Sequence, residues 1–160
     1  MTQMQQLEFR ARDAVSRCLI RSLAVPNVYF DARWPDKRGH QVDVLAIDRA
    51  GVGDVHVVEI KHAAQAAFDA VESLMKIPAQ FRWIAFYRES TSSQAIAIAM
   101  NANIFYPSNG MGRVGVIEVL RSGEHDLGAN ISIRAERFAG SLKEKVQKFT
   151  KVHHADVEFE

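Results

Sequence analysis

Residues 40–62 contain two runs rich in β-branched residues, separated by a short glycine-containing segment centred on Gly51. Such a pattern is typical of two antiparallel strands joined by a tight connection. With the turn centred on Gly51, Asp43 faces Glu59, and Gln41 faces Lys61. Since strand side chains alternate between the two faces of a sheet, Asp43, Glu59 and Lys61 are predicted to share one face.

Two carboxylates directly opposite each other in a hairpin have Cβ atoms roughly 4.5–5.5 Å apart. At that separation they repel, and the repulsion raises the pKa of one of them. A hard divalent cation removes the conflict, because carboxylate oxygens are the ligands that it prefers. The Asp43–Glu59 pair therefore predicts a metal site. The alternative is a solvent-facing sheet surface on which Glu59 and Lys61 form a salt bridge.

Helical and strand patterns alternate along the rest of the chain. In order, we expect a helix over 4–23, a strand over 28–30, the hairpin, a helix over 63–75, a strand over 81–87, a helix over about 94–101, strands over 115–120 and around 131–133, and a helix over 141–149. The helix after the hairpin is long enough for a crossover connection. The sequence thus predicts an α/β fold, a mixed sheet flanked by helices.

Length and composition set the class of protein. A chain of 160 residues is one domain by expectation, here residues 1–150 with a loose tail over 151–160. No apolar stretch approaches the ~20 residues of a membrane span, and residues 1–8 do not resemble a secretory signal. Cys18 is the single cysteine, which excludes a disulfide framework. A cytoplasmic protein is expected. A net charge of +1 argues against non-specific coating of DNA.

An aspartate on one strand, followed by Glu-x-Lys on the next, within a helix–three strands–helix–strand order, resembles the PD-(D/E)XK nuclease superfamily. That superfamily includes restriction endonucleases and Holliday-junction resolvases. The resemblance covers roughly residues 4–100 and implies a restriction-endonuclease-like αβββαβ core, extended by a C-terminal hairpin and helix. The chain departs from the motif in having Val42 where the name has proline. A literal Pro35-Asp36 pair lies in a predicted turn instead.

The resemblance implies a role for each motif residue. Asp43 and Glu59 would bind Mg²⁺ or Mn²⁺, and the Ile60 carbonyl would join the metal ligands. Lys61 would orient or activate the attacking water. Many members also carry a glutamate on the N-terminal helix, and Glu8 is the best match here.

Four further polar residues near the motif are candidates for substrate binding. Gln65, four residues beyond Lys61, could hold a phosphate or a water molecule. Lys37 and Arg38 precede the hairpin and could contact phosphates, and Gln41 lies at its start. For each of these residues a solvated surface position is the alternative.

These observations lead to one functional expectation and two alternatives. We expect a magnesium-dependent endonuclease or exonuclease that hydrolyses phosphodiester bonds, with DNA favoured over RNA because most members of the resembled family cut DNA. Duplex cutters of this size often act as homodimers, so a homodimer is the expected assembly. The alternatives are a non-catalytic binding, immunity or regulatory protein on the same fold, and an RNA-cleaving toxin domain with the same site.

Overall fold

The computed structural model describes residues 2–35, 38–48, 53–61, 64–87, 114–121, 123 and 126–158. Its elements, in chain order, are α1 (Gln3–Leu23), β1 (Asn27–Trp34), β2 (His40–Ile47), β3 (Val55–Lys61), α2 (Ala64–Met75), β4 (Phe81–Tyr87), β5 (Gly115–Arg121), β6 (Leu127–Ile133), α4 (Lys143–Val152) and β7 (Val157–Glu158). None of the helices in the described part of the chain is both long and apolar enough to cross a membrane.

The strands form one mixed sheet in the order β6-β5-β4-β3-β2-β1-β7. The pairs β3–β4 and β4–β5 are parallel, and the other neighbouring pairs are antiparallel. The crossover from β3 to β4 runs through α2, as a parallel pair requires. The predicted α/β class with a mixed sheet flanked by helices is therefore confirmed.

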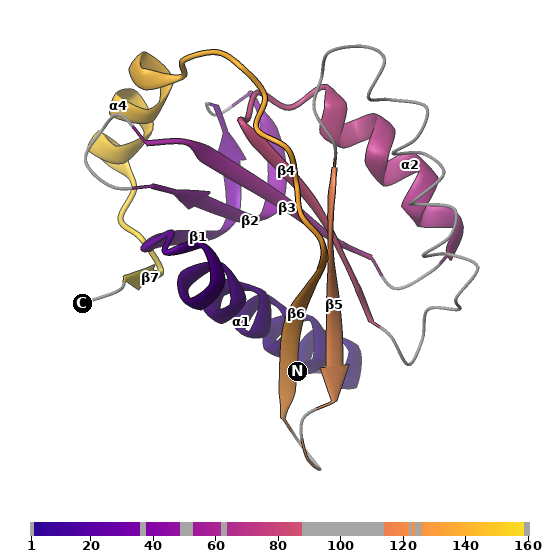
Figure 1. The fold of residues 1–160 in the computed structure, drawn as a ribbon. Coiled ribbons are helices and arrows are strands. Elements are labelled where there is room, and N and C mark those ends of the chain that lie inside the picture. The colour runs from indigo at the N-terminus through magenta and orange to yellow at the C-terminus, as the bar shows by residue number, and fades with distance from the viewer. Residues whose placement is uncertain are drawn as a thin grey trace.

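Helices cover both faces of the sheet (Figure 1). Val15 and Leu19 of α1 pack on one face in a cluster with Val44 and Val58. The opposite face is covered by α2 and α4, whose buried side chains, among those the structure describes, are Ala70, Val71, Leu74, Val146 and Phe149. Each helix buries one apolar stripe, as amphipathic helices do.

Local sequence signals explain where α1 begins and ends. Thr2 is its N-cap: the Thr2 hydroxyl accepts from the Gln5 backbone N–H, and the Gln5 side chain accepts in return from the Thr2 N–H. This reciprocal pair satisfies two donors that a helix start leaves free. The helix ends at Ala24, which adopts the left-handed conformation, and Pro26 follows. The predicted helix over 4–23 is confirmed.

The predicted hairpin and its register are also confirmed along most of its length. Val44 pairs with Val58, and Ile47 pairs with Val55. Helix α2 and strand β4 lie within one residue of their predicted bounds, whereas β1 is longer than the predicted strand over 28–30. The predicted helix over about 94–101 lies outside the described residues.

The prediction of a loose C-terminal tail over 151–160 is wrong for most of that segment. Helix α4 continues to Val152, and β7 pairs with β1 at the edge of the sheet. Asp156 provides the link, because its carboxylate accepts from the Phe30 backbone N–H at 2.7 Å and its own N–H donates to the Val28 carbonyl. A two-residue strand is too short to show periodicity, so only the tertiary pairing reveals it.

His56 is a buried ionisable residue within β3. Its ring stacks on Phe81 at 4.4 Å between centroids, and its Nδ1 accepts from the Trp83 indole N–H at 3.1 Å. Burial, partly opposed by the charges of Asp54 and Asp48, lowers the pKa of His56 to about 4. The folded protein therefore holds this histidine neutral well below its ordinary titration range.

A pH dependence of stability follows from His56. Between about pH 6.5 and 4, His56 is protonated in the unfolded chain and neutral in the folded chain, so acidification favours unfolding. Relative to a His56→Gln variant, the wild type should lose about 2 kcal/mol of unfolding free energy between about pH 7 and pH 5. Urea unfolding at both pH values measures the difference, with the exposed His154→Gln as control. Parallel losses in wild type and His56→Gln would contradict the assignment.

Candidate active site

A kink shared by β1 and β2 shapes the region around Asp43. The two strands pair on both sides of Asp31 and Asp43, but these two residues are skipped in the ladder. Asp31 has a φ of 49°, a left-handed conformation that aspartate tolerates better than most residues. Tyr29 and Ala32 are three positions apart and would point to opposite faces of a regular strand. Both belong to the same core cluster, so the alternation of side chains along β1 is interrupted at Asp31.

The kink frees the Asp43 carboxylate from the regular sheet surface. Its Oδ2 accepts a hydrogen bond from the Ile60 backbone N–H at 2.7 Å, while the regular β2–β3 ladder runs only to Val44 and Val58. The β2–β3 ladder does not extend to the predicted partners Gln41 and Lys61, so the predicted pairing at this end of the hairpin is not found.

Glu59 and Lys61 lie at the carboxyl end of β3, and both are half-buried. Strand alternation puts them on the face that α2 covers, together with Val55 and Val57. Burial, followed by the charge of Asp43 and a hydrogen bond with it, raises the pKa of Glu59 well above its ordinary value, and the Lys61 charge opposes the rise. The structure thus brings the Asp43 and Glu59 carboxyl groups together, by way of the kink.

A cavity of about 180 Å³ opens on the other side of Asp43, towards α1. Its lining residues are Glu8, Arg12, Asp31, Asp43 and Ile60. The predicted residue Glu8 therefore shares a cavity with Asp43. Helix α1 is held there by Tyr87 at the end of β4, whose hydroxyl donates to the Leu7 carbonyl. Burial and the nearby Glu8 charge raise the pKa of Tyr87.

Arg12 and Asp31 are residues of this cavity that sequence reasoning missed. Arg12 forms an ion pair with Asp31, and its guanidinium lies 5.3 Å from the centroid of the Phe30 ring. One signal was present in the sequence, because Arg12 follows Glu8 by one helical turn and so shares its edge of α1. No sequence pattern indicated Asp31, because its place in the cavity depends on its left-handed backbone conformation at the kink.

Of the four predicted substrate-binding residues, the structure describes the side chains of two, and neither lines the cavity. Arg38 and Gln41 are exposed and are not among the lining residues. Lys37 lies outside the described residues. Gln65 falls in the first turn of α2, four positions after Lys61, but its side chain lies outside the described part of the chain.

The donor set around Asp43 has the chemistry of a site for a hard cation. Within the described residues, no three His, Cys, Asp or Glu side chains converge closely enough to enclose a metal. Mg²⁺ does not need such a cage, because it keeps several waters and is commonly held by one or two carboxylates. The mutual repulsion of Asp43 and Glu59 is the feature that a cation would relieve. The residues present therefore fit Mg²⁺ or Mn²⁺.

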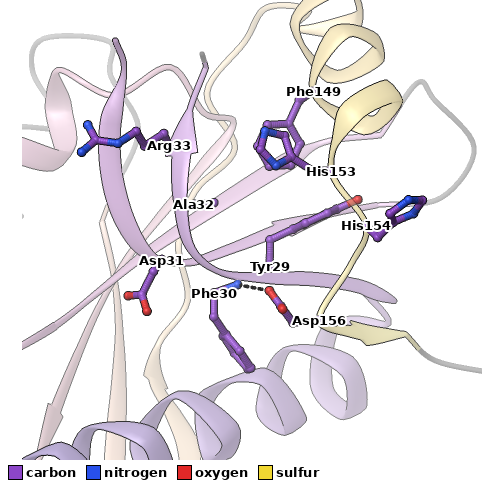
Figure 2. Close-up of a pocket in the computed structure, with 9 residues that line it drawn as sticks. All are labelled: Tyr29, Phe30, Asp31, Ala32, Arg33, Phe149, His153, His154 and Asp156. Atoms are coloured by element: carbon purple, nitrogen blue, oxygen red, sulfur yellow. Dashed lines mark hydrogen bonds between the residues drawn. The ribbon is translucent and has the colours of Figure 1, made fainter. Parts of the chain in front are cut away.

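A second cavity, of about 330 Å³, lies between β1 and the C-terminal segment. Asp31 lines it as well as the first cavity. Figure 2 shows Asp156 directed at the β1 backbone, where it accepts from Phe30, and His153 lying against Phe149. Asp156 thus ties the C-terminal segment to β1 at this cavity.

Comparison with known proteins shows a similar fold and gives no information on activity. No protein-family model matches the chain, and no curated protein matches it. A solved structure of the SPO1766 protein of unknown function from Silicibacter pomeroyi is similar, with a TM-score of 0.56 and 16% sequence identity. The similarity covers 90% of this chain and 81% of that one. The two proteins therefore share an overall architecture.

Proposed function

We propose that this protein is a divalent-metal-dependent nuclease that hydrolyses phosphodiester bonds, with DNA as the favoured substrate. The observation that carries the proposal is the close pair of Asp43 and Glu59 carboxyl groups, with Lys61 two residues further along the same strand. Paired carboxylates beside a lysine are the groups that metal-assisted hydrolysis uses.

The topology of the first half of the chain supports the proposal. The order α1, β1, β2, β3, α2, β4 is the αβββαβ order on which the resemblance to the PD-(D/E)XK superfamily rests. Asp43 comes from β2, and Glu59 and Lys61 come from β3, the two strands of the central hairpin. A restriction-endonuclease-like core is therefore part of the proposal.

Each residue has a role in this proposal. Asp43, Glu59 and the Ile60 carbonyl would hold the cation, and Glu8 would reach it through a water molecule. When bound, Mg²⁺ or Mn²⁺ supplies Lewis acidity and lowers the pKa of water. Lys61 orients the attacking water and stabilises negative charge that develops on the phosphate. Arg12, oriented by its ion pair with Asp31, lies beside Asp43 in the cavity.

A non-catalytic binding or regulatory protein on the same fold is the second candidate. It is favoured by one observation, the hydrogen bond between the Glu59 and Asp43 side chains, which lets the two carboxyl groups share a proton without a cation. Such a protein would retain the Asp43–Glu59 pair as a structural feature and would bind a partner without hydrolysis. An RNA-cleaving domain would differ from the main proposal in substrate alone.

Cleavage assays separate these functions. Plasmid DNA, branched DNA and RNA are incubated with the wild type and Mg²⁺ or Mn²⁺, in parallel with EDTA and with the isosteric variant Glu59→Gln. We expect metal-dependent cleavage of DNA that both EDTA and Glu59→Gln abolish. Cleavage of RNA alone would favour the toxin function. If the wild type cleaves none of the substrates, the proposed nuclease activity is contradicted and the non-catalytic binding function is favoured.

A further inference from the structure

A third cavity, of about 540 Å³, lies between α1 and the β5–β6 hairpin, away from Asp43. Its lining residues are Ala14, Arg17, Cys18, Arg21, Ser22, Leu120, Arg121, Gly128, Ala129 and Asn130. We call this cavity the arginine groove. Ala14 and Cys18 are buried and form its floor, whereas Arg17, Arg21 and Arg121 are exposed at its walls.

Helix geometry places the arginine groove on the edge of α1 opposite the candidate active site. Arg17 follows Glu8 by nine residues, and Arg21 follows Arg12 by nine, which is two and a half turns in each case. The same nine residues correspond to about 13 Å along the helix axis. Both sites therefore use α1, on opposite edges, over the same face of the sheet.

The walls of the groove carry three guanidinium groups from two elements. Arg17 and Arg21 are one turn apart on α1, where side chains are neighbours, and Arg121 ends β5. Arg17 is oriented by a hydrogen bond to the Leu127 carbonyl at 3.1 Å and by an ion pair with Asp13 at 3.1 Å. One guanidinium is thus held in place at the groove before any ligand binds.

The lining of the groove is positively charged. Its described lining residues include three arginines and no acidic residue, and Asp13 pairs with Arg17 from outside the lining. Ser22 and Asn130 add neutral hydrogen-bonding groups. Guanidinium groups present several N–H donors in a fixed plane that matches phosphate oxygens, which makes arginine the preferred partner of phosphate.

We propose that the arginine groove binds the phosphodiester backbone of a nucleic acid. We choose a nucleic acid among phosphate-bearing ligands because of the proposed nuclease function, on which this inference rests. A groove about 13 Å from Glu8 along α1 would bind the substrate at a distance from the cleaved bond. A single strand rises about 3.4 Å per phosphate, so roughly four nucleotides span that length. Positive charges on two walls suit a continuous strand better than one isolated phosphate.

Binding of a fluorescein-labelled DNA duplex and single strand, followed by anisotropy in EDTA at several salt concentrations, tests the proposal without cleavage. The variant Arg17→Gln/Arg21→Gln/Arg121→Gln should bind at least about tenfold more weakly than wild type at low salt. The slope of log affinity against log salt should fall by about 2–3. Lys145→Gln/Lys148→Gln/Lys151→Gln on α4 is the matched control, with the same charge change on the opposite face.

Arg17 also contacts the Leu127 carbonyl, so a second variant guards against a folding defect. Arg21→Glu/Arg121→Glu leaves Arg17 in place and should weaken binding at least as much. Circular dichroism and urea unfolding verify that each variant is folded. Equal affinity and salt slope in wild type and both arginine variants would overturn the proposal, as would a loss of the same size in the α4 control.

The proposal for the arginine groove and the proposal of nuclease activity can be contradicted independently. Glu59→Gln should lose cleavage and retain DNA binding, whereas the arginine variants should lose binding in EDTA. Inorganic phosphate should compete weakly with the labelled strand. Full displacement by low millimolar phosphate would overturn the nucleic-acid assignment in favour of a small phosphate ligand. DNA binding that depends on the three arginines, without any cleavage, would support the proposed binding at the groove and contradict the proposed nuclease activity.

Discussion

Replacing Lys61 by alanine is expected to reduce DNA cleavage by on the order of 10²–10⁴-fold, the usual contribution of a positioned acid–base group. The fold and most of the metal affinity should remain, because Lys61 is half-buried at the end of β3 and the proposed metal ligands are the neighbouring carboxylates. Cleavage rates are compared under saturating Mg²⁺ or Mn²⁺ at matched circular dichroism. Lys148→Ala, exposed on α4, is the control and should cleave like wild type.

A salt-bridge role for Lys61 makes a different prediction. If the lysine only pairs with Glu59, its loss costs at most about 1 kcal/mol of unfolding free energy and leaves activity unchanged. Equal cleavage by wild type and Lys61→Ala would therefore remove Lys61 from the reaction. The result would point to a contaminating nuclease or to a site elsewhere in the protein.

Loss of either paired carboxylate should weaken metal binding by at least about tenfold, because the charge count of the ligands sets cation affinity. For Asp43 the suitable variant is Asp43→Asn, since its side-chain oxygen can still accept from the Ile60 N–H. Alanine would leave that donor without its partner and cost stability. Glu59→Gln is the matching variant on β3. Isothermal calorimetry with Mg²⁺ and Mn²⁺ measures both.

The raised pKa of Glu59 adds a pH dependence to this experiment. Below its pKa Glu59 holds a proton that competes with the cation, so metal affinity should increase as the pH rises. In Asp43→Asn the repulsive charge is gone, and the increase should shift to lower pH. Glu8→Gln, acting through a water molecule, should have the smaller effect. Unchanged metal affinity in both Asp43→Asn and Glu59→Gln would remove the metal from this site.

The sequence by itself determined the elements and the central hairpin. Periodic apolar residues predict α1 and α2, and the two β-branched runs on either side of a glycine-containing segment predict the pairing of Val44 with Val58. These features depend on residues close in the chain, where periodicity and turn chemistry act directly. That register also predicts that Asp43 and Glu59 lie close together, although the regular ladder stops at Val44 and Val58 and the two carboxyl groups meet beyond its end.

Tertiary structure alone decided how the candidate site is built around that pair. At the kink Asp43 accepts a hydrogen bond from the Ile60 N–H, and Arg12 of α1 forms an ion pair with Asp31 of β1. The sheet edge is completed by β7, more than a hundred residues from its partner strand β1. These contacts depend on backbone conformation at one residue and on packing between distant elements. Neither leaves a periodic signal in the sequence, because side-chain patterns report which face is buried and not which element covers it.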